Sequence, residues 1–531
     1  MTGALRRLLV AMMALGLAVV PAGAQDFPVA FLRAMALRSQ PVPQAIQAIG
    51  TYVDAAGLDE AQTVRLQALL EAARAANAAG DADRALAALA QARVLLQGGT
   101  WDAAQAFASS LTVAAPGAFV TSGAGTTLTL DRAYSAPAVP VEVRFTAAMP
   151  GQPPVSLGEI DLPRGLRRAR QIDLAVPPVT GRGTIMAEVV ADGRVLARLP
   201  SRVDFVPDLA ALEADARRRL EPLAPVAQAE ALVLYPFELA RQIGAGEREV
   251  EARDFADRLA RSARVLAALE QGRDIVTRAV GDQDRAYRFA ETGEIVPFRI
   301  HVPAGWDAVQ SLPLIMVLHG GGGNENDMLT LDQGKLGRLA DRYGYIVVSP
   351  LGYRPLGAYG TPIRLPSVYG TDTQQGRAVG GPERAQLLAR SERDVLDVLE
   401  LVASEYGADR SRFYLTGHSM GGGGSWYLAH QYPELWDAVA PSAGPFFIDN
   451  YDFERLRPMS IMIVQGSGDP PSLGANRQLA IDLLARGLEV NYLETPSVDH
   501  GQTFGASLPS IFEFFERQKL RDAPEVPLEL R

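Results

Sequence analysis

The stretch that decides the fold is RFYLTGHSMGGGGSWYLAH, residues 412–430. It begins with a short aromatic and aliphatic run, too brief for a helix, which predicts a buried strand. The segment that follows, GGGGSWYLAHQYP, is interpreted as the opening of a helix, and Gly417, Ser419 and Gly421 fall at the junction. A Gly-x-Ser-x-Gly sequence between a strand and a helix predicts a sharp turn that exposes the serine hydroxyl above a sheet. We therefore interpret Ser419 as a candidate nucleophile rather than as part of a purely structural glycine turn.

The surrounding sequence, residues 283–519, alternates short apolar runs with helical patterns. The predicted buried strands are residues 313–320, 345–350, 412–417, 437–444 and 460–466. An antiparallel hairpin with Thr292-Gly293 near its turn is predicted ahead of them, at the sheet edge. Strands that alternate with helices in this way form a mostly parallel sheet with helices on both faces. We expect an α/β fold with a doubly wound sheet.

The candidate base is found by elimination, because the chain has only five histidines. A serine hydroxyl needs a base to take its proton, and in this type of turn the acid and then the histidine follow the serine along the chain. His430 and His500 remain. His430 lies eleven residues along the helix that begins at Ser419, or roughly 16 Å away at 1.5 Å per residue. His500, in the loop after residues 489–495, is therefore the predicted base.

A carboxylate must orient the imidazole of that base. Asp469 comes just after the buried strand at residues 460–466, at the strand end where loops of such sheets carry functional groups. Asp499 is adjacent to His500 in sequence, and neighbouring side chains point apart, while Asp449 and Asp452 belong to an earlier loop. Asp469 is the predicted third member.

Acyl transfer also requires hydrogen-bond donors for the negative charge that develops on the carbonyl oxygen. The backbone N–H of Met420, next to the candidate nucleophile, supplies one. The loop HGGGGNEN after the strand at residues 313–320 supplies the second, from Gly321 with Gly322 as the alternative. We interpret His319 in this loop as a structural residue. The pattern requires no metal ion or cofactor.

A long irregular segment, residues 353–384, is rich in Gly, Pro and Tyr and has no periodicity. Loops of this length in compact domains are usually functional or mobile. Tyr353, Tyr359 and Tyr369 are candidate substrate-binding residues that could stack on an aromatic acyl group. The alternative is a surface lid packed by its own aromatic side chains.

Taken together, these motifs make residues 283–519 resemble the α/β-hydrolase superfamily. The stretches LHGGGGNEN, DRSRFYLTGHSMGGGGSWYLAHQYPELWDAVAPSAG and VQGSGDP…VDHG match its order of parts. Within the superfamily the chain looks like the secreted feruloyl esterases, polyhydroxybutyrate depolymerases and prolyl-oligopeptidase-like hydrolases, although many of the first two carry cysteines near the site and this chain has none. The resemblance implies a serine hydrolase that cleaves carboxylic esters through an acyl-enzyme. A serine peptidase of the prolyl-oligopeptidase type and a non-catalytic binding protein with a degenerate fold are the competing hypotheses.

The part of the chain before this domain shows three changes of pattern. Residues 25–111 are alanine-rich with helical periodicity, residues 112–206 contain short alternating strands, and residues 207–276 return to helices. Asp192-Gly193 between two alternating runs predicts a tight hairpin. We expect a helical segment, a small immunoglobulin-like β-sandwich and a helical connector, with structural or substrate-positioning roles.

The composition and the first residues bound the cellular setting. The chain has 531 residues, a net charge of −10 and no cysteine, which excludes disulfides and argues against nucleic acid as a partner. Arg6 and Arg7 precede an apolar run at residues 8–20 and the small residues Ala22-Gly23-Ala24. The apolar run is shorter than the roughly 20 residues that span a bilayer. Residues 1–24 therefore predict an export signal and a periplasmic or extracellular destination for the protein. The resemblance to the α/β-hydrolase superfamily implies an ester, small or polymeric, as its substrate.

Overall fold

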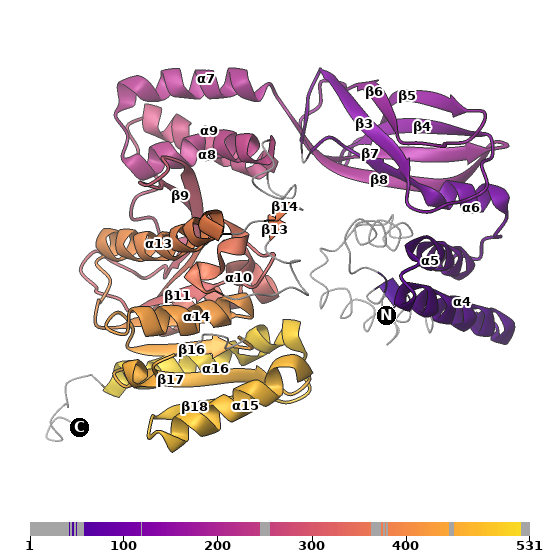
Figure 1. Ribbon diagram of the computed structural model, residues 1–531. Helices are drawn as coiled ribbons and strands as arrows, with labels where there is room; N and C mark the ends of the chain where they lie inside the picture. Colours follow the sequence, from indigo (N-terminus) through magenta and orange to yellow (C-terminus); the bar gives the residue numbers. More distant parts are fainter. Residues whose placement is uncertain are drawn as a thin grey trace, which may run out of the picture. The chain divides into compact units, whose positions relative to one another are not determined.

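The computed structural model describes Val42, Ala45, Ile46 and Ile49 and then residues 58–117, 119–244, 255–362, 373–374, 377–378, 381–444 and 451–521. The predicted export signal at residues 1–24 lies outside this described part. The chain divides into two compact units, one of Met1–Leu212 with Val250–Leu259 and the other of Glu213–Glu249 with Ala260–Arg531 (Figure 1). None of the described helices is long and apolar enough to cross a membrane.

The first unit begins with three helices, α4 (Glu60–Ala78), α5 (Ala82–Leu96) and α6 (Ala103–Ser110). An aspartate caps each of them: the side chains of Asp59, Asp81 and Asp102 accept the N–H of the third helical residue. Leucines and alanines on the facing sides of α4 and α5 are buried in a common core. The helical hairpin follows from this spacing of apolar residues and from the caps.

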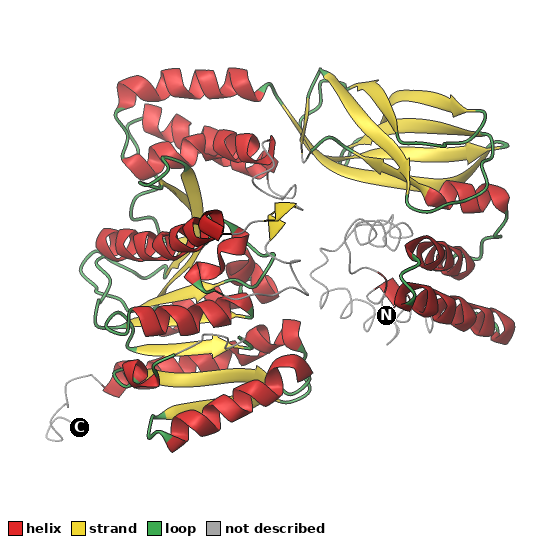
Figure 2. Cartoon of the chain, viewed as in Figure 1, coloured by secondary structure: helices red, strands yellow, loops and turns green. Residues whose placement is uncertain are grey.

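Two sheets complete the first unit. Their strands are β1 (Leu111–Ala114), β2 (Phe119–Thr121), β3 (Gly125–Arg132), β4 (Val141–Ala148), β5 (Val155–Leu162), β6 (Arg170–Ala175), β7 (Gly181–Ala191) and β8 (Arg194–Val206). One sheet has the order β1-β3-β6 and the other β2-β8-β7-β4-β5 (Figure 2). Buried side chains of both sheets form one core. Asp192 and Gly193 turn the β7–β8 hairpin with positive φ values of 50° and 74°, as a two-residue turn of this hand requires.

The second unit is built on an eight-stranded sheet of order β18-β17-β16-β15-β11-β12-β10-β9. The strands are β9 (Gly281–Arg288), β10 (Ile295–Val302), β11 (Leu314–Leu318), β12 (Ile346–Pro350), β15 (Phe413–His418), β16 (Ala438–Ser442), β17 (Ser460–Gly466) and β18 (Val490–Thr495). The six strands from β11 onward are parallel, and the hairpin β9–β10 adds two antiparallel strands at one edge. A separate two-stranded ribbon, β13 (Thr373–Gln374) with β14 (Arg377–Ala378), lies within the predicted irregular segment.

Helices cover both faces of this sheet. The longer ones are α11 (Lys335–Tyr343), α13 (Gly381–Tyr406), α14 (Met420–Gln431), α15 (Pro470–Ala485) and α16 (His500–Arg521), with the short turns α10 (Asp327–Thr330), η4 (Leu331–Gln333), η5 (Pro355–Gly360) and η6 (Phe453–Leu456). Alternate residues of β11, β15 and β17 face two different cores. One core contains apolar residues of α13, α14 and α15, and the other contains those of α10, α11 and α16. The predicted α/β class with a doubly wound sheet is thereby confirmed for this part of the chain.

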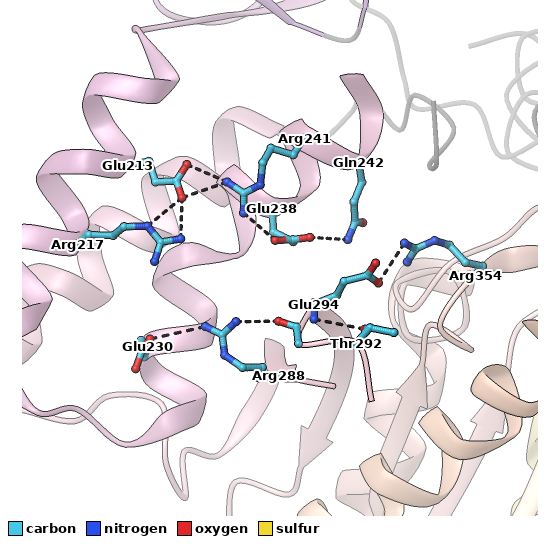
Figure 3. Close-up of polar contacts among 11 residues, drawn as sticks. Glu213, Arg217, Glu230, Glu238, Arg241, Gln242, Arg288, Thr292, Glu294 and Arg354 are labelled. Carbon is cyan, nitrogen blue, oxygen red and sulfur yellow. Dashed lines mark hydrogen bonds and ion pairs between the residues drawn. The ribbon is translucent and has the colours of Figure 1, made fainter. Parts of the chain in front are cut away.

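The helices predicted as a connector belong largely to this second unit. They are α7 (Leu209–Leu220), the turn η3 (Glu221–Leu223), α8 (Ala227–Gly244) and α9 (Phe255–Glu270), and α8 packs on β9 and β10. In Figure 3, Glu213 accepts hydrogen bonds from Arg217 and Arg241, and Arg288 at the end of β9 faces Glu230 of α8. Packing contacts and an ion pair thus join α8 to the edge hairpin of the sheet.

Arg285 of β9 is a buried charged residue that bonds the connector helices to the sheet domain. Its side chain is 1% exposed and pairs with Glu405 of α13 at 2.7 Å. It also donates to the Val276 carbonyl at 3.0 Å, to the Tyr406 hydroxyl at 3.1 Å and to the Gln228 side chain of α8. One guanidinium thus joins the connector helices, the edge strand and a helix that covers the sheet.

We predict that Arg285→Met destabilises the protein by about 3–5 kcal/mol, because it leaves the Glu405 carboxylate buried without its cation. Arg410→Met is the matched control: its ion pair with Glu400 is more than half exposed, so its loss costs about 1 kcal/mol or less. Denaturant unfolding followed by tryptophan fluorescence reports chiefly on this unit, which holds three of the four tryptophans. Equal stability losses in the two variants would contradict the assigned role of Arg285.

Candidate active site

Ser419 occupies a strained turn between β15 and α14. Its backbone has φ 56° and ψ −115°, a region that side-chain-bearing residues rarely adopt. The turn is held from both sides: the Ser419 N–H donates to the Ser442 carbonyl at 2.9 Å, and the Ser419 carbonyl accepts the Gly423 N–H at 3.0 Å. This backbone conformation directs the Ser419 side chain away from the strand, as the sequence motif predicts.

The glycines around Ser419 are required by close approach of backbone to backbone. A Cβ atom on Gly421 would lie 2.1 Å from the Leu318 carbonyl oxygen, and one on Gly417 would lie 2.5 Å from the Gly421 carbonyl oxygen. A Cβ on Gly422 would lie 2.6 Å from the Ser442 carbonyl oxygen. The glycine run therefore allows the first turn of α14 to sit directly on the ends of β11 and β16.

The structure brings Ser419, His500 and Asp469 together. His500 is the first residue of α16, rather than a loop residue as predicted, and its Nε2 lies 2.8 Å from Ser419 Oγ. Its Nδ1 lies 2.8 Å from Oδ2 of Asp469, which directly precedes α15. The imidazole side chain is 47% exposed and the carboxylate 3%. An accessible imidazole is thus held by a buried carboxylate.

The competing residues lie elsewhere or make other bonds. His430, near the end of α14, accepts the Asp452 N–H at its Nε2. Asp452 caps the turn η6 through the Glu454 N–H, and Asp499 accepts the Gln502 N–H at 3.0 Å. Asp449 lies outside the described residues. These partners leave Asp469 as the carboxylate that contacts the His500 ring.

The charges of the His500–Asp469 pair depend on the hydrogen-bond donors around Asp469 and on the neighbouring ring of His418. Burial raises the pKa of Asp469, but hydrogen bonds from Ser472, His500 and Gln465 outweigh this effect and hold the pKa below its ordinary value. The His418 ring lies 4.8 Å from the His500 ring, and burial together with repulsion from His500 lowers the pKa of His418 to about 3. His418 is therefore neutral near neutral pH. Sequence reasoning missed His418, although it occupies the variable position before Ser419.

The glycine-rich loop after β11 passes beside Ser419. A Cβ on Gly320 would lie 3.6 Å from Ser419 Cβ, and Gly321 follows it at the surface. His319 is fully buried and uses both ring nitrogens, on the Gly320 carbonyl at 2.8 Å and the Leu351 carbonyl at 3.0 Å. Met420 is the first residue of α14, where a backbone N–H has no partner within the helix.

The tyrosines predicted to bind substrate are placed differently. Tyr353 is 4% exposed and Tyr359 1% exposed, and both belong to the core of the second unit. The Tyr359 hydroxyl donates to the His319 carbonyl at 3.2 Å, and its ring meets the His319 ring edge-on at 5.5 Å. Tyr369 lies outside the described residues. Tyr359 therefore contacts the glycine-rich loop from the core of the second unit. Neither the Tyr353 ring nor the Tyr359 ring has an exposed face on which a substrate could stack.

Among the residues that the structure describes, no group of three or more metal-ligating side chains gathers at one place. The site consists of a hydroxyl, an imidazole, a carboxylate and nearby backbone N–H groups. Chemically, this set can activate a hydroxyl for attack on a carbonyl carbon and stabilise the resulting oxyanion.

Comparison with known proteins agrees with the α/β-hydrolase esterase resemblance. Residues 296–483 match the family model described as esterase PHB depolymerase. The chain is 29% identical over 171 residues to the bifunctional acetylxylan esterase/xylanase XynS20E of Neocallimastix patriciarum, and the match covers 32% of this chain and 21% of that protein. The chain thus spans about a fifth of the length of this relative.

Similar solved structures include a CE1 ferulic acid esterase of Anaeromyces mucronatus, with 19% identity, 44% of this chain and 89% of that chain covered, and a TM-score of 0.35. A fluorophosphonate-binding serine hydrolase of Staphylococcus aureus is 16% identical. The match covers 44% of this chain and 98% of that chain, with a TM-score of 0.33. A thermostable esterase is also 16% identical. The match covers 77% of this chain and 99% of that chain, with a TM-score of 0.36.

We predict that Gly422→Ala lowers the free energy of unfolding by about 1–3 kcal/mol, because its Cβ would overpack against Ser442 and Gly444. Gly474→Ala in α15 is the matched control, since nothing lies within 4 Å of its Cβ and alanine favours a helix. Thermal unfolding of both variants checks this. A Gly422 variant as stable as the Gly474 variant would mean that the close contact at the turn is not limiting.

Proposed function

We propose that the second unit is a serine hydrolase that cleaves carboxylic esters through an acyl-enzyme, with Ser419 as nucleophile, His500 as general base and acid, and Asp469 as the residue that orients His500. The observation that carries the proposal is the continuous pair of 2.8 Å contacts from Ser419 Oγ through the imidazole to the Asp469 carboxylate. The match of this domain to the esterase PHB depolymerase family supports the same reaction class.

The reaction follows from these positions. His500 Nε2 takes the Ser419 proton while Oγ attacks the ester carbonyl carbon, and the charge on the carbonyl oxygen is held by the backbone N–H groups of Met420 and Gly321. The imidazolium then gives its proton to the leaving alcohol oxygen, which forms the acyl-enzyme. A water molecule then attacks the acyl-enzyme in the same way, and the carboxylic acid is released. Apart from this water, the proposed chemistry uses only groups of the protein.

The substrate class is proposed from the relatives. Their names specify acetylxylan, ferulic acid esters and polyhydroxybutyrate, so an acyl ester of a polysaccharide or a polyester is the class to test first. The N-terminal pattern at residues 1–24 supports export of the protein. A panel of p-nitrophenyl esters, acetylated and feruloylated xylan, polyhydroxybutyrate and peptide anilides separates the ester hypothesis from the peptidase one. Preferential cleavage of the anilides would favour the peptidase.

We predict that Ser419→Ala lowers kcat for a short p-nitrophenyl ester by at least about 10⁴-fold, because no other group supplies the nucleophile. The control Ser404→Ala removes an exposed hydroxyl on α13 that bonds Glu400, and it should leave turnover unchanged. Labelling of the wild-type protein by a fluorophosphonate, lost in Ser419→Ala, provides a second readout. Absence of labelling in a folded wild-type protein would favour the non-catalytic binding hypothesis.

The pH dependence follows from the neighbouring charges. A general base must be neutral, so kcat/KM should fall as pH is lowered from about 8 to 5. Asp469 has a pKa below its ordinary value and His418 one of about 3, so neither changes charge in this range. We therefore predict a single protonation, seen as a limiting slope of one in log kcat/KM measured by pH-stat titration. A flat profile, or a slope of two, would contradict the assignment.

A further inference from the structure

The Asp469 carboxylate accepts hydrogen bonds from other donors besides the His500 imidazole. Its Oδ2 atom accepts His500 Nδ1 at 2.8 Å, Ser472 Oγ at 2.6 Å and Gln465 Nε2 at 3.1 Å. The last two donors come from the same short segment as the acid, at the end of β17 and the first turn of α15. They converge on the oxygen that faces His500.

Gln465 is itself fixed by a further buried amide. Asn476 Nδ2 donates to Gln465 Oε1 at 2.6 Å, and Gln465 Nε2 also lies 3.1 Å from Ser472 Oγ. Gln465 is fully buried and Asn476 is 2% exposed. Burial of two amides without partners would be costly, so their mutual bonding fixes which end of the Gln465 amide points at the carboxylate.

The local sequence DPPS, residues 469–472, explains why the carboxylate is available. Asp469 is the N-cap of α15, a position where an aspartate side chain usually accepts the N–H of the second or third helical residue. Here the second helical residue is Pro471, which carries no N–H, and Asp469 makes no side-chain cap bond to the third, Ser472, either. The Ser472 hydroxyl bonds the carboxylate instead. The capping aspartate is thus diverted from its helix toward His500.

We propose that Ser472, together with the Gln465–Asn476 pair, is a positioning element that holds the Asp469 carboxylate toward His500 and limits how strongly that carboxylate attracts the imidazolium proton. The inference rests on the proposed function and assigns to it residues that do not touch the substrate. The low pKa of Asp469, to which the Ser472 and Gln465 bonds contribute, agrees with it.

The sign of the expected pH effect follows from the donor. A hydroxyl that donates to a carboxylate stabilises its charge and makes it a weaker base. Without that hydroxyl, the carboxylate stabilises the imidazolium more strongly, and the acid limb of kcat/KM moves to higher pH. The titratable groups near Asp469 are His500 and, against its ring, neutral His418. Arg477 of α15 and Glu494 of β18 pair with each other at the surface.

The test compares three serine variants of the full chain. Ser472→Ala should lower kcat by about tenfold, the loss typical of one hydrogen bond to a charged group, with KM nearly unchanged, and move the acid limb upward by about half a pH unit. Ser472→Thr keeps a hydroxyl and should restore the wild-type profile. Ser460→Ala, at the opposite end of β17, removes a buried hydroxyl that bonds Gln518 at 2.8 Å and should lose stability without a shift in the profile.

The outcomes separate this inference from the function on which it rests. An active wild-type protein whose profile is unchanged in Ser472→Ala overturns the positioning role alone. A shift of the same size in Ser460→Ala overturns it as well, because the effect would then be one of general stability. A folded wild-type protein that neither hydrolyses esters nor reacts with a fluorophosphonate overturns the proposed function itself. If Ser472→Ala does not fold, the rate of fluorophosphonate labelling of Ser472→Thr against pH decides: a profile displaced from that of the wild type contradicts the hydroxyl's role.

Discussion

The close approach of α14 to the ends of β11 and β16 is the constraint on which the second unit depends. The helix can begin at Met420 only because Gly421 and Gly422 let its backbone touch neighbouring strand ends where a Cβ would collide. The same approach forces Ser419 into a left-handed conformation, and the bond of its N–H to the Ser442 carbonyl holds it there. Such strain persists only where the surrounding structure overdetermines it, and here the fully buried parallel strands supply that rigidity.

The topology of the sheet then converts distant sequence segments into neighbours. Strands β15, β16, β17 and β18 are adjacent and parallel, so the segments after β15, β17 and β18 leave the same edge. Ser419, Asp469 and His500 follow these three strands. This arrangement explains why the sequence was sufficient to predict that these three residues lie together: the glycine motif marked the turn, the order of strands fixed where the partners had to follow, and five histidines left few alternatives.

Other parts of the site could not be predicted, because their roles arise from contacts between segments without periodicity. Tyr359 lies in an irregular turn with φ 56°, and only the fold shows that its hydroxyl meets the His319 carbonyl rather than a substrate. Gln465 reads in the sequence as one polar residue at the end of an apolar strand. Its bond to Asn476 depends on how β17 and α15 pack. The Asp192-Gly193 turn, by contrast, depends on residues within a few positions, and the pattern predicts it well.

The site also shows a gradient from fixed to accessible groups. The acid is nearly inaccessible and its charge is held by neighbouring hydroxyl and amide donors, whereas almost half of the imidazole side chain is exposed. A charge that must stay in place is best held by preorganised donors in a dry environment, because those donors need not reorient when the imidazolium forms. In the proposed reaction, the imidazole exchanges protons with substrate and water and must instead be reachable. His418 completes this separation: its low pKa keeps it neutral, so it packs against His500 without adding a competing positive charge.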